Sequence, residues 1–107
     1  MFSTDILEVA NAEPIEGIVI GKMGWSDYGK ECVPQYDQQP KGKLLTWQEA
    51  EPLLTYDYDN GYGAPGCNSI CAWTKSRVIF VTQYDGSTSI NWMPRNPGDH
   101  MPKMPGG

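Results

Sequence analysis

The feature that most constrains the fold is a run of three β-rich segments near the C-terminus, separated by links of two residues. The segments are residues 69–74 (SICAWT), 77–84 (RVIFVTQY) and 87–93 (STSINWM). The second link, Asp85-Gly86, is a residue pair that favours a tight hairpin turn. Links this short join antiparallel neighbours, because a parallel crossover needs a dozen residues or more. The sequence therefore predicts a three-stranded antiparallel meander.

The apolar pattern assigns a different environment to each strand of this meander. Residues 78–81 are apolar at four successive positions, which predicts a central strand buried on both faces. Apolar and polar residues alternate through 87–93, which predicts one buried face. Pro94 ends this strand, and we expect residues 96–107 to form a flexible, disordered tail because they have nothing to pack against.

Upstream of the meander the sequence predicts one further strand and one short helix. The β-branched run in 17–23 (GIVIGKM) indicates the strand, and glycines and prolines make 24–43 a long loop. Thr46 and Glu49 have the spacing of a capping box, which places a helix start at Thr46. The helix should be brief because Pro52 lacks the amide proton that a helix interior needs.

These elements predict an α+β domain with a four-stranded, mainly antiparallel sheet, one short helix packed on one face, and long loops. The length of 107 residues suits a single domain, which we expect to span residues 17–95. Residues 1–16 contain four acidic residues and no basic one. They are therefore expected to form a solvated N-terminal acidic arm, and residues 96–107 a flexible tail.

Charge and cysteine content restrict the classes of function. The net charge is −5 and the eight basic residues are scattered, which argues against direct binding of nucleic acid. No apolar run has the ~18 residues of a membrane span, and the N-terminus lacks the basic start of a signal peptide. An odd number of cysteines suits a reducing compartment, so we expect a cytoplasmic protein without a membrane partner.

The residues that could form a metal or catalytic site are few. Cys32, Cys67, Cys71 and His100 could in principle hold zinc, but Cys67 and Cys71 within one strand would lie ~13 Å apart. Cysteines of this kind, Cys71 above all, are better interpreted as small buried hydrophobic residues. The only histidine lies in the expected tail, and no nucleophile–base pair can be named. We therefore predict no metal site, no cofactor, no catalytic residue and no enzymatic activity.

Two acidic, tyrosine-rich loops are the remaining candidates for a functional surface. Loops of this composition give large contact areas at low entropy cost and are typical of recognition surfaces. The predicted binding surface consists of Trp25, Asp27, Tyr28, Tyr56, Asp57, Tyr58, Asp59 and Tyr62. The alternative is that the tyrosines complete a small core and keep their polar tips in water.

The segments TWQEA, YDYDNGYG, AWTKSRVIF, YDGST and PRNP occur in this order between Thr46 and Pro97. In this half the chain resembles an uncharacterised family of small phage- and prophage-encoded proteins. The resemblance implies an accessory protein that binds a host protein and inhibits or redirects it, in the cytoplasm of the bacterial host. The acidic charge adds the expectation of a partner with a basic surface, such as a nucleic-acid-binding or defence protein.

Two other classes of function remain open at this point. A structural or self-assembling role, for example in a virion, would use an exposed edge strand such as 87–93. A small-molecule-binding protein or enzyme would have its pocket between the short helix and the 56–66 loop.

Overall fold

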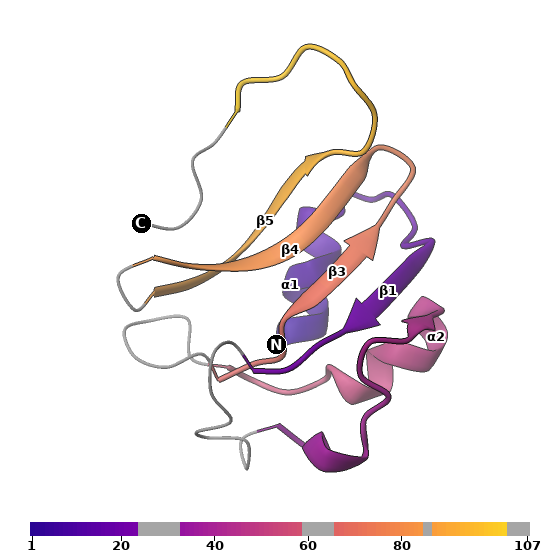
Figure 1. Ribbon diagram of the computed structural model, residues 1–107, viewed down its shortest axis with the longest axis vertical. Helices are drawn as coiled ribbons and strands as arrows, with labels where there is room; N and C mark the ends of the chain where they lie inside the picture. The colour runs from indigo at the N-terminus through magenta and orange to yellow at the C-terminus, as the bar shows by residue number, and fades with distance from the viewer. Residues whose placement is uncertain (24–32, 59–65, 85–86, 103–107) are drawn as a thin grey trace.

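The computed structural model describes residues 1–23, 33–58, 66–84 and 87–102 (Figure 1). Within them, a five-stranded antiparallel sheet forms one layer and helices form the other, which confirms the α+β class. The strands lie in the order β2-β1-β3-β4-β5. Their bounds are Gly17–Ile20 for β1, Leu44–Leu45 for β2, Ile70–Trp73 for β3, Arg77–Tyr84 for β4 and Ser87–Pro94 for β5. The helices are α1, Phe2–Val9, and α2, Trp47–Ala50, with single 3-10 turns at Tyr36–Gln38 and Glu51–Leu53.

The predicted meander is confirmed, because β3, β4 and β5 pair consecutively and antiparallel. The pairing of β4 with β5 is regular from Arg77 opposite Pro94 to Tyr84 opposite Ser87. The prediction that β4 is a central strand is confirmed, because β3 and β5 pair with it on either side. The prediction that β4 is buried on both faces is wrong, because Val78 and Phe80 are only partly buried. They lie on the face of the sheet away from the helices, whereas Ile79 between them is fully buried.

The N-terminal residues do not form the solvated arm that their charge predicted. Residues 2–9 are the helix α1, which packs against the sheet. Phe2, Ile6 and Ala10 follow one another at intervals of four residues, so they share one face of the helix. All three are completely buried in the core. The apolar face of α1 therefore outweighs the solvation of its acidic residues.

Acidic residues of this N-terminal segment bind distant parts of the fold rather than water alone. The pairs are Asp5 with Tyr58, Glu13 with Thr74 and Ser76, and Glu16 with Arg95. Glu13 is the best held, since its carboxylate accepts from the Thr74 hydroxyl at 2.6 Å and the Ser76 hydroxyl at 2.8 Å. These hydrogen bonds hold the pKa of Glu13 below its usual value. Glu13 thereby ties the segment after α1 to the turn between β3 and β4.

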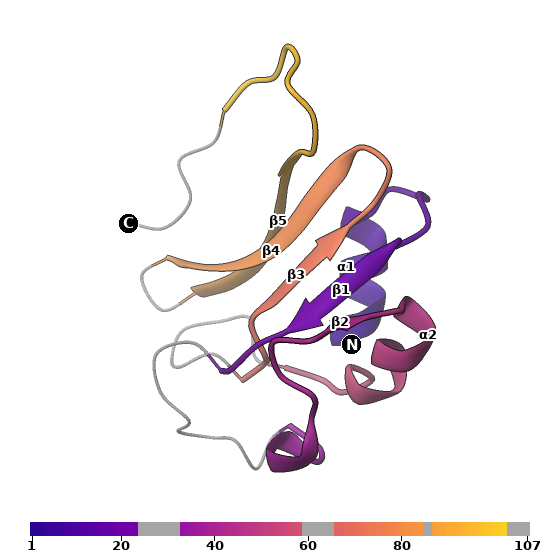
Figure 2. The same ribbon diagram turned by 45° about the vertical axis from the view of Figure 1, so that its right-hand side comes forward.

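The capping box at Thr46 is confirmed. The Thr46 hydroxyl accepts from the Glu49 amide at 3.1 Å, and the Glu49 carboxylate accepts from the Thr46 amide at 2.9 Å. Pro52 lies in the 3-10 turn that follows α2, so this helix is as brief as expected. Strand β2, just before α2, was not predicted, because two residues carry no periodic signal. Figure 2 shows β2 beside β1, with α2 following it.

A buried polar cluster lies under the end of the sheet where β3 begins. Asn68 is fully buried, and its side-chain amide donates to the Gly21 carbonyl at 3.0 Å and to Gln39 at 2.8 Å. The Tyr56 hydroxyl donates to the Asn68 side-chain oxygen at 2.8 Å and accepts from the Asn68 backbone amide at 2.9 Å. Asn68 thereby joins three loops that are far apart in the sequence.

The chain after β5 is irregular up to residue 102, where its description ends. The Arg95 amide donates to the Ser76 carbonyl at 2.9 Å. The ring of His100 lies 5.3 Å from that of Trp92, and the Arg77 guanidinium lies 3.8 Å from the same indole. The expectation that this tail has nothing to pack against is therefore wrong at His100. In the part of the chain that is described, no helix is long and apolar enough to cross a membrane.

Candidate functional site

The predicted aromatic loop surface is only partly described by the structure. Five of its eight residues lie outside the described residues: Trp25, Asp27, Tyr28, Asp59 and Tyr62. The other three, Tyr56, Asp57 and Tyr58, are described. Their contacts show which of the two interpretations of the tyrosines holds at these positions.

Tyr56 and Tyr58 belong to the core rather than to an open recognition surface. Tyr56 is buried, and its hydroxyl is bound to Asn68, so burial raises the pKa of Tyr56 above its usual value. The ring of Tyr58 packs edge-on against that of Phe2 at 5.0 Å, and its hydroxyl donates to Asp5 at 2.8 Å. Desolvation, together with this acceptor, raises the pKa of Tyr58. Both tyrosines therefore complete the core, as the alternative interpretation predicted, but the Tyr56 hydroxyl is bound to the buried Asn68 and not kept in water.

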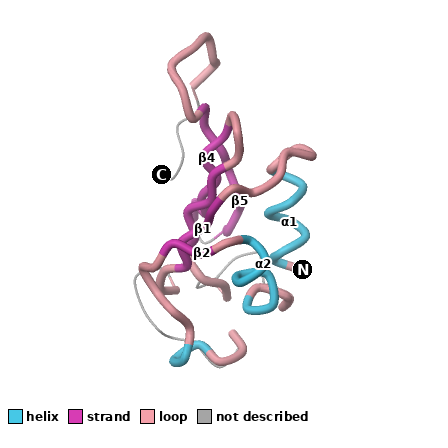
Figure 3. The backbone as a smooth tube through the Cα atoms, turned by 90° about the vertical axis from the view of Figure 1, so that its right-hand side faces the viewer, coloured by secondary structure: helices cyan, strands magenta, loops and turns pink. Residues whose placement is uncertain are grey.

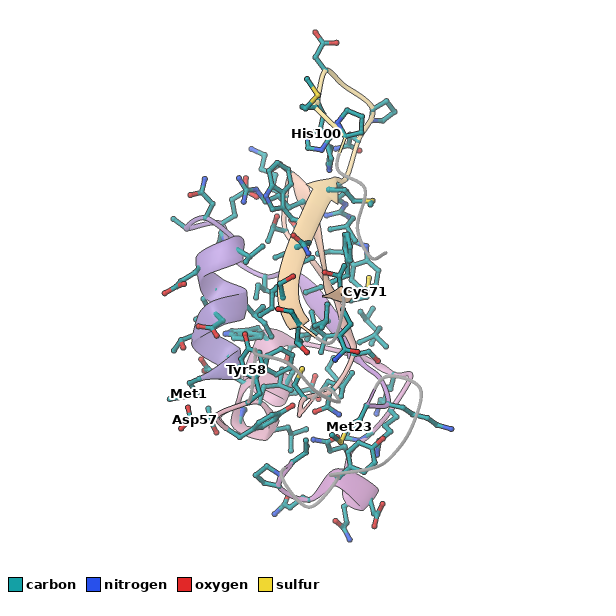
Figure 4. All side chains as sticks on the ribbon, turned by 90° about the vertical axis from the view of Figure 1, so that its left-hand side faces the viewer. Met1, Met23, Asp57, Tyr58, Cys71 and His100 are labelled. Atoms are coloured by element: carbon teal, nitrogen blue, oxygen red, sulfur yellow. The ribbon has the colours of Figure 1, made fainter. Side chains whose placement is uncertain are left out.

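Asp57 lies between them in the sequence and is almost fully exposed. Its carboxylate is 3.5 Å from the N-terminal ammonium of Met1. Figure 4 shows Met1, Asp57 and Tyr58 together at the N-terminal end of α1. An ion pair between two groups this exposed contributes little to stability, because water screens it.

Among the residues that the structure describes, the helices cover only one face of the sheet. Leu45, Ile18, Ala72 and Ile79 are paired in register across four strands, and all four are buried, which identifies this row as part of the helix side. Because side chains alternate along a strand, the neighbouring rows point the other way. Figure 3 shows α1 and α2 on the same side of the strands. Figure 4 shows Cys71 on the side away from α1.

We call this uncovered surface the open face and define it by two rows of side chains. The first row is Leu44, Val19, Cys71, Phe80 and Asn91, and the second is Trp73, Val78 and Met93. All but Asn91 are apolar, and none is charged. Leu44 is 65% exposed and Met93 is 46% exposed, at the two outer strands of the sheet. The side chains between them are all partly exposed.

The size of the open face can be estimated from sheet geometry. Five strands ~4.8 Å apart span roughly 24 Å, and two rows of side chains ~6.7 Å apart span about 13 Å along the strands. The face therefore covers roughly 300 Å². An apolar patch of this size lies in the range of the largest patch on a typical monomer, which often has a binding function.

The cysteines in the described residues do not form a reactive or metal-binding group. Burial raises the pKa of Cys67 to about 12 and also raises the pKa of Cys71 above its usual value. Both are free thiols, and Cys32 lies outside the described residues. No group of three or more histidine, cysteine or acidic side chains is placed to hold a metal ion within the described ranges. Cys71 is partly exposed on the open face, so its reaction with a thiol reagent can report whether this face is covered.

The open face was not predicted, although the sequence contains a signal for it. The apolar run at 78–81 was correctly taken to place apolar side chains on both faces of β4. The second face was assumed to be covered, but the described residues supply no second layer over it. A strand with apolar residues on both faces, in a chain whose helices can cover only one face of the sheet, indicates an exposed apolar face.

Comparisons of the chain with protein-family models, with curated proteins and with solved structures gave no match. The resemblance to phage-encoded proteins is therefore still a prediction from the sequence.

Proposed function

We propose that this protein acts by non-catalytic binding of another protein, and that the open face is its docking surface. The observation that carries the proposal is the apolar face of the sheet, with Leu44 and Met93 exposed at its outer strands. Burying apolar surface is the main favourable contribution to protein association, at about 25 cal/mol per Å² before the costs of association. A face without charges also avoids the desolvation cost that buried charges add to an interface.

The partner suited to this face has an apolar patch bordered by basic residues. The chain has a net charge of −5, so long-range attraction favours encounters with a basic protein. The charge acts on the rate of encounter, whereas the apolar contact determines how long the complex lasts. In the context of the phage resemblance, such a partner would be a host nucleic-acid-binding or defence protein, and binding would inhibit it.

The proposal is tested by capture from bacterial lysate with matched variants. The face variant, Leu44→Gln with Met93→Gln, replaces exposed apolar side chains by polar ones of similar size and leaves the net charge unchanged. The control is Leu7→Gln, which makes the same change at a residue of α1 that is 38% exposed on the helix layer. We expect a stoichiometric partner that the wild type and Leu7→Gln retain and that the face variant loses.

Two results would contradict the proposal. One is a partner that the face variant retains as well as the wild type does, which would place binding elsewhere on the chain. The other is the absence of any retained protein at both low and moderate salt. Raising the salt concentration should slow complex formation more than it speeds dissociation, because screening acts mainly on the charge-driven encounter.

A further inference from the structure

The two edges of the sheet are unequal. At one edge lies β2, which has two residues, and at the other lies β5, which has eight (Figure 2). An edge strand has unpaired backbone N–H and C=O groups, and proteins usually protect a long one with charged residues, an internal proline or a bulge. A two-residue edge needs no such protection.

Strand β5 has none of these protective features within its length. Its sequence, STSINWMP, contains no charged residue, and its only proline is the last residue. Its register with β4 is unbroken over all eight residues, so no bulge turns the edge away. Every second residue of β5 therefore directs its N–H and C=O groups outward, and within the described residues no strand pairs with that side.

We propose that β5 is a dimerisation edge, where two copies of this chain pair their β5 strands antiparallel across a two-fold axis. The absence of charge on β5 allows this pairing between two chains that each carry −5. After pairing, the edges that remain in the described part of each chain are the two β2 strands, which offer two residues each. The assembly therefore closes at two copies, as an isologous contact does.

This dimer would also enlarge the docking surface, since one open face covers only roughly 300 Å². Standard protein interfaces bury ~800 Å² on each partner, more than one open face provides. Antiparallel pairing about a two-fold axis perpendicular to the sheet keeps both open faces on the same side. The joined face would cover roughly 600 Å², which is closer to the standard area. This last consequence depends on the proposed function, whereas the dimer itself rests on the edge strand alone.

The dimer is tested by light scattering of the purified protein at about 100 μM, where weak homodimers still form. We expect a mass of about twice the 11.9 kDa of the chain. The edge variant is Ser89→Lys, which places a charge in the middle of β5, where the two copies would meet. Its control is Gln48→Lys, an exposed residue of α2 with the same change in net charge. Ser89→Lys should give the monomer mass with an unchanged circular dichroism spectrum, and Gln48→Lys should give the dimer mass.

The outcomes separate the dimer from the proposed function. A wild-type monomer at this concentration, or a dimer that survives Ser89→Lys, would overturn the edge pairing. A dimer that the face variant loses would assign self-association to the open face instead.

If Ser89→Lys does not fold, hydrogen exchange of the wild-type protein decides between the two. β5 amides protected more strongly at high than at low protein concentration support the pairing, and concentration-independent exchange overturns it. Capture of a partner by the folded monomer would leave the proposed function standing without the dimer.

Discussion

Replacing Phe2 by alanine should cost a large part of the stability of this protein, although the residue is second in the chain. Phe2 is completely buried, and its ring lies 5.6 Å from that of Tyr56 and 5.0 Å from that of Tyr58. Its amide also donates to the Tyr56 carbonyl at 2.8 Å, a bond that the substitution leaves in place. The perturbation therefore removes side-chain packing and little else.

The magnitude follows from the cavity that the ring leaves behind. Phe→Ala substitutions in a packed core cost about 3–5 kcal/mol. The aromatic contacts with the two tyrosines place Phe2 in the upper part of this range. A domain of this size has a total stability of about 5–15 kcal/mol, so a loss of ~4 kcal/mol should lower Tm by roughly 15–25 °C.

The assay is thermal and urea unfolding followed by circular dichroism. Leu7→Ala is the matched control on the same helix, because Leu7 is 38% exposed and its truncation should cost about 1 kcal/mol or less. If Phe2→Ala cost no more than Leu7→Ala, α1 would contribute nothing to the core. The N-terminal residues would then be the solvated arm that the sequence predicted.

Two further predictions follow from the polar contacts. Asn68→Leu should destabilise the fold by about 3 kcal/mol, because it leaves the buried groups of Tyr56, Gln39 and Gly21 without their partner. Urea unfolding measures this cost, and a value below ~1 kcal/mol would show that the cluster is not a structural link. The pKa of Glu13 is lowered in the folded state. The stability that its carboxylate adds to the fold is therefore fully present above the unfolded pKa of ~4.5, and it is lost as the pH falls through the folded pKa. The Tm advantage of the wild type over Glu13→Gln should therefore shrink as the pH falls below about 4.5, and a constant difference would contradict this assignment.

The meander and the capped helix could be predicted because local chemistry determines them. Two-residue links allow only antiparallel neighbours, and Thr46 with Glu49 satisfies the amides at a helix start without help from the rest of the fold. These elements follow from residues that are close in the sequence. The structure has them where the sequence placed them.

The helix α1 was missed because its stability comes from distant contacts. Its eight residues are too few for a helix to persist alone, and its acidic residues indicate solvation. The spacing of Phe2, Ile6 and Ala10 did contain the helical signal, but only the fold shows that Tyr56 and Tyr58 complete their packing. The tyrosines were assigned to a binding surface for the same reason, since burial is not visible in composition.

The open face could not be predicted because it depends on what the rest of the chain does not cover. The apolar residues of β4 are explicit in the sequence, yet a strand buried on both sides and one with an open side give the same pattern. The difference arises when α1 and α2 pack on the same side of the sheet, as Figure 3 shows. The exposed edge at β5, in contrast, was expected from the sequence, because no strand was predicted after 87–93, and in the described chain no later strand pairs with β5.

The most direct test of the docking surface is the alkylation rate of Cys71 in a Cys32→Ser variant, alone and bound to the captured partner. Alkaline pH is needed, because the raised pKa of Cys71 lowers its thiolate fraction near neutrality, and the buried Cys67 should stay unreactive until unfolding. We expect the partner to slow alkylation of Cys71 at least tenfold, whereas edge pairing of β5 alone should leave the rate unchanged. An equal rate with and without the bound partner would contradict the open face as the docking surface.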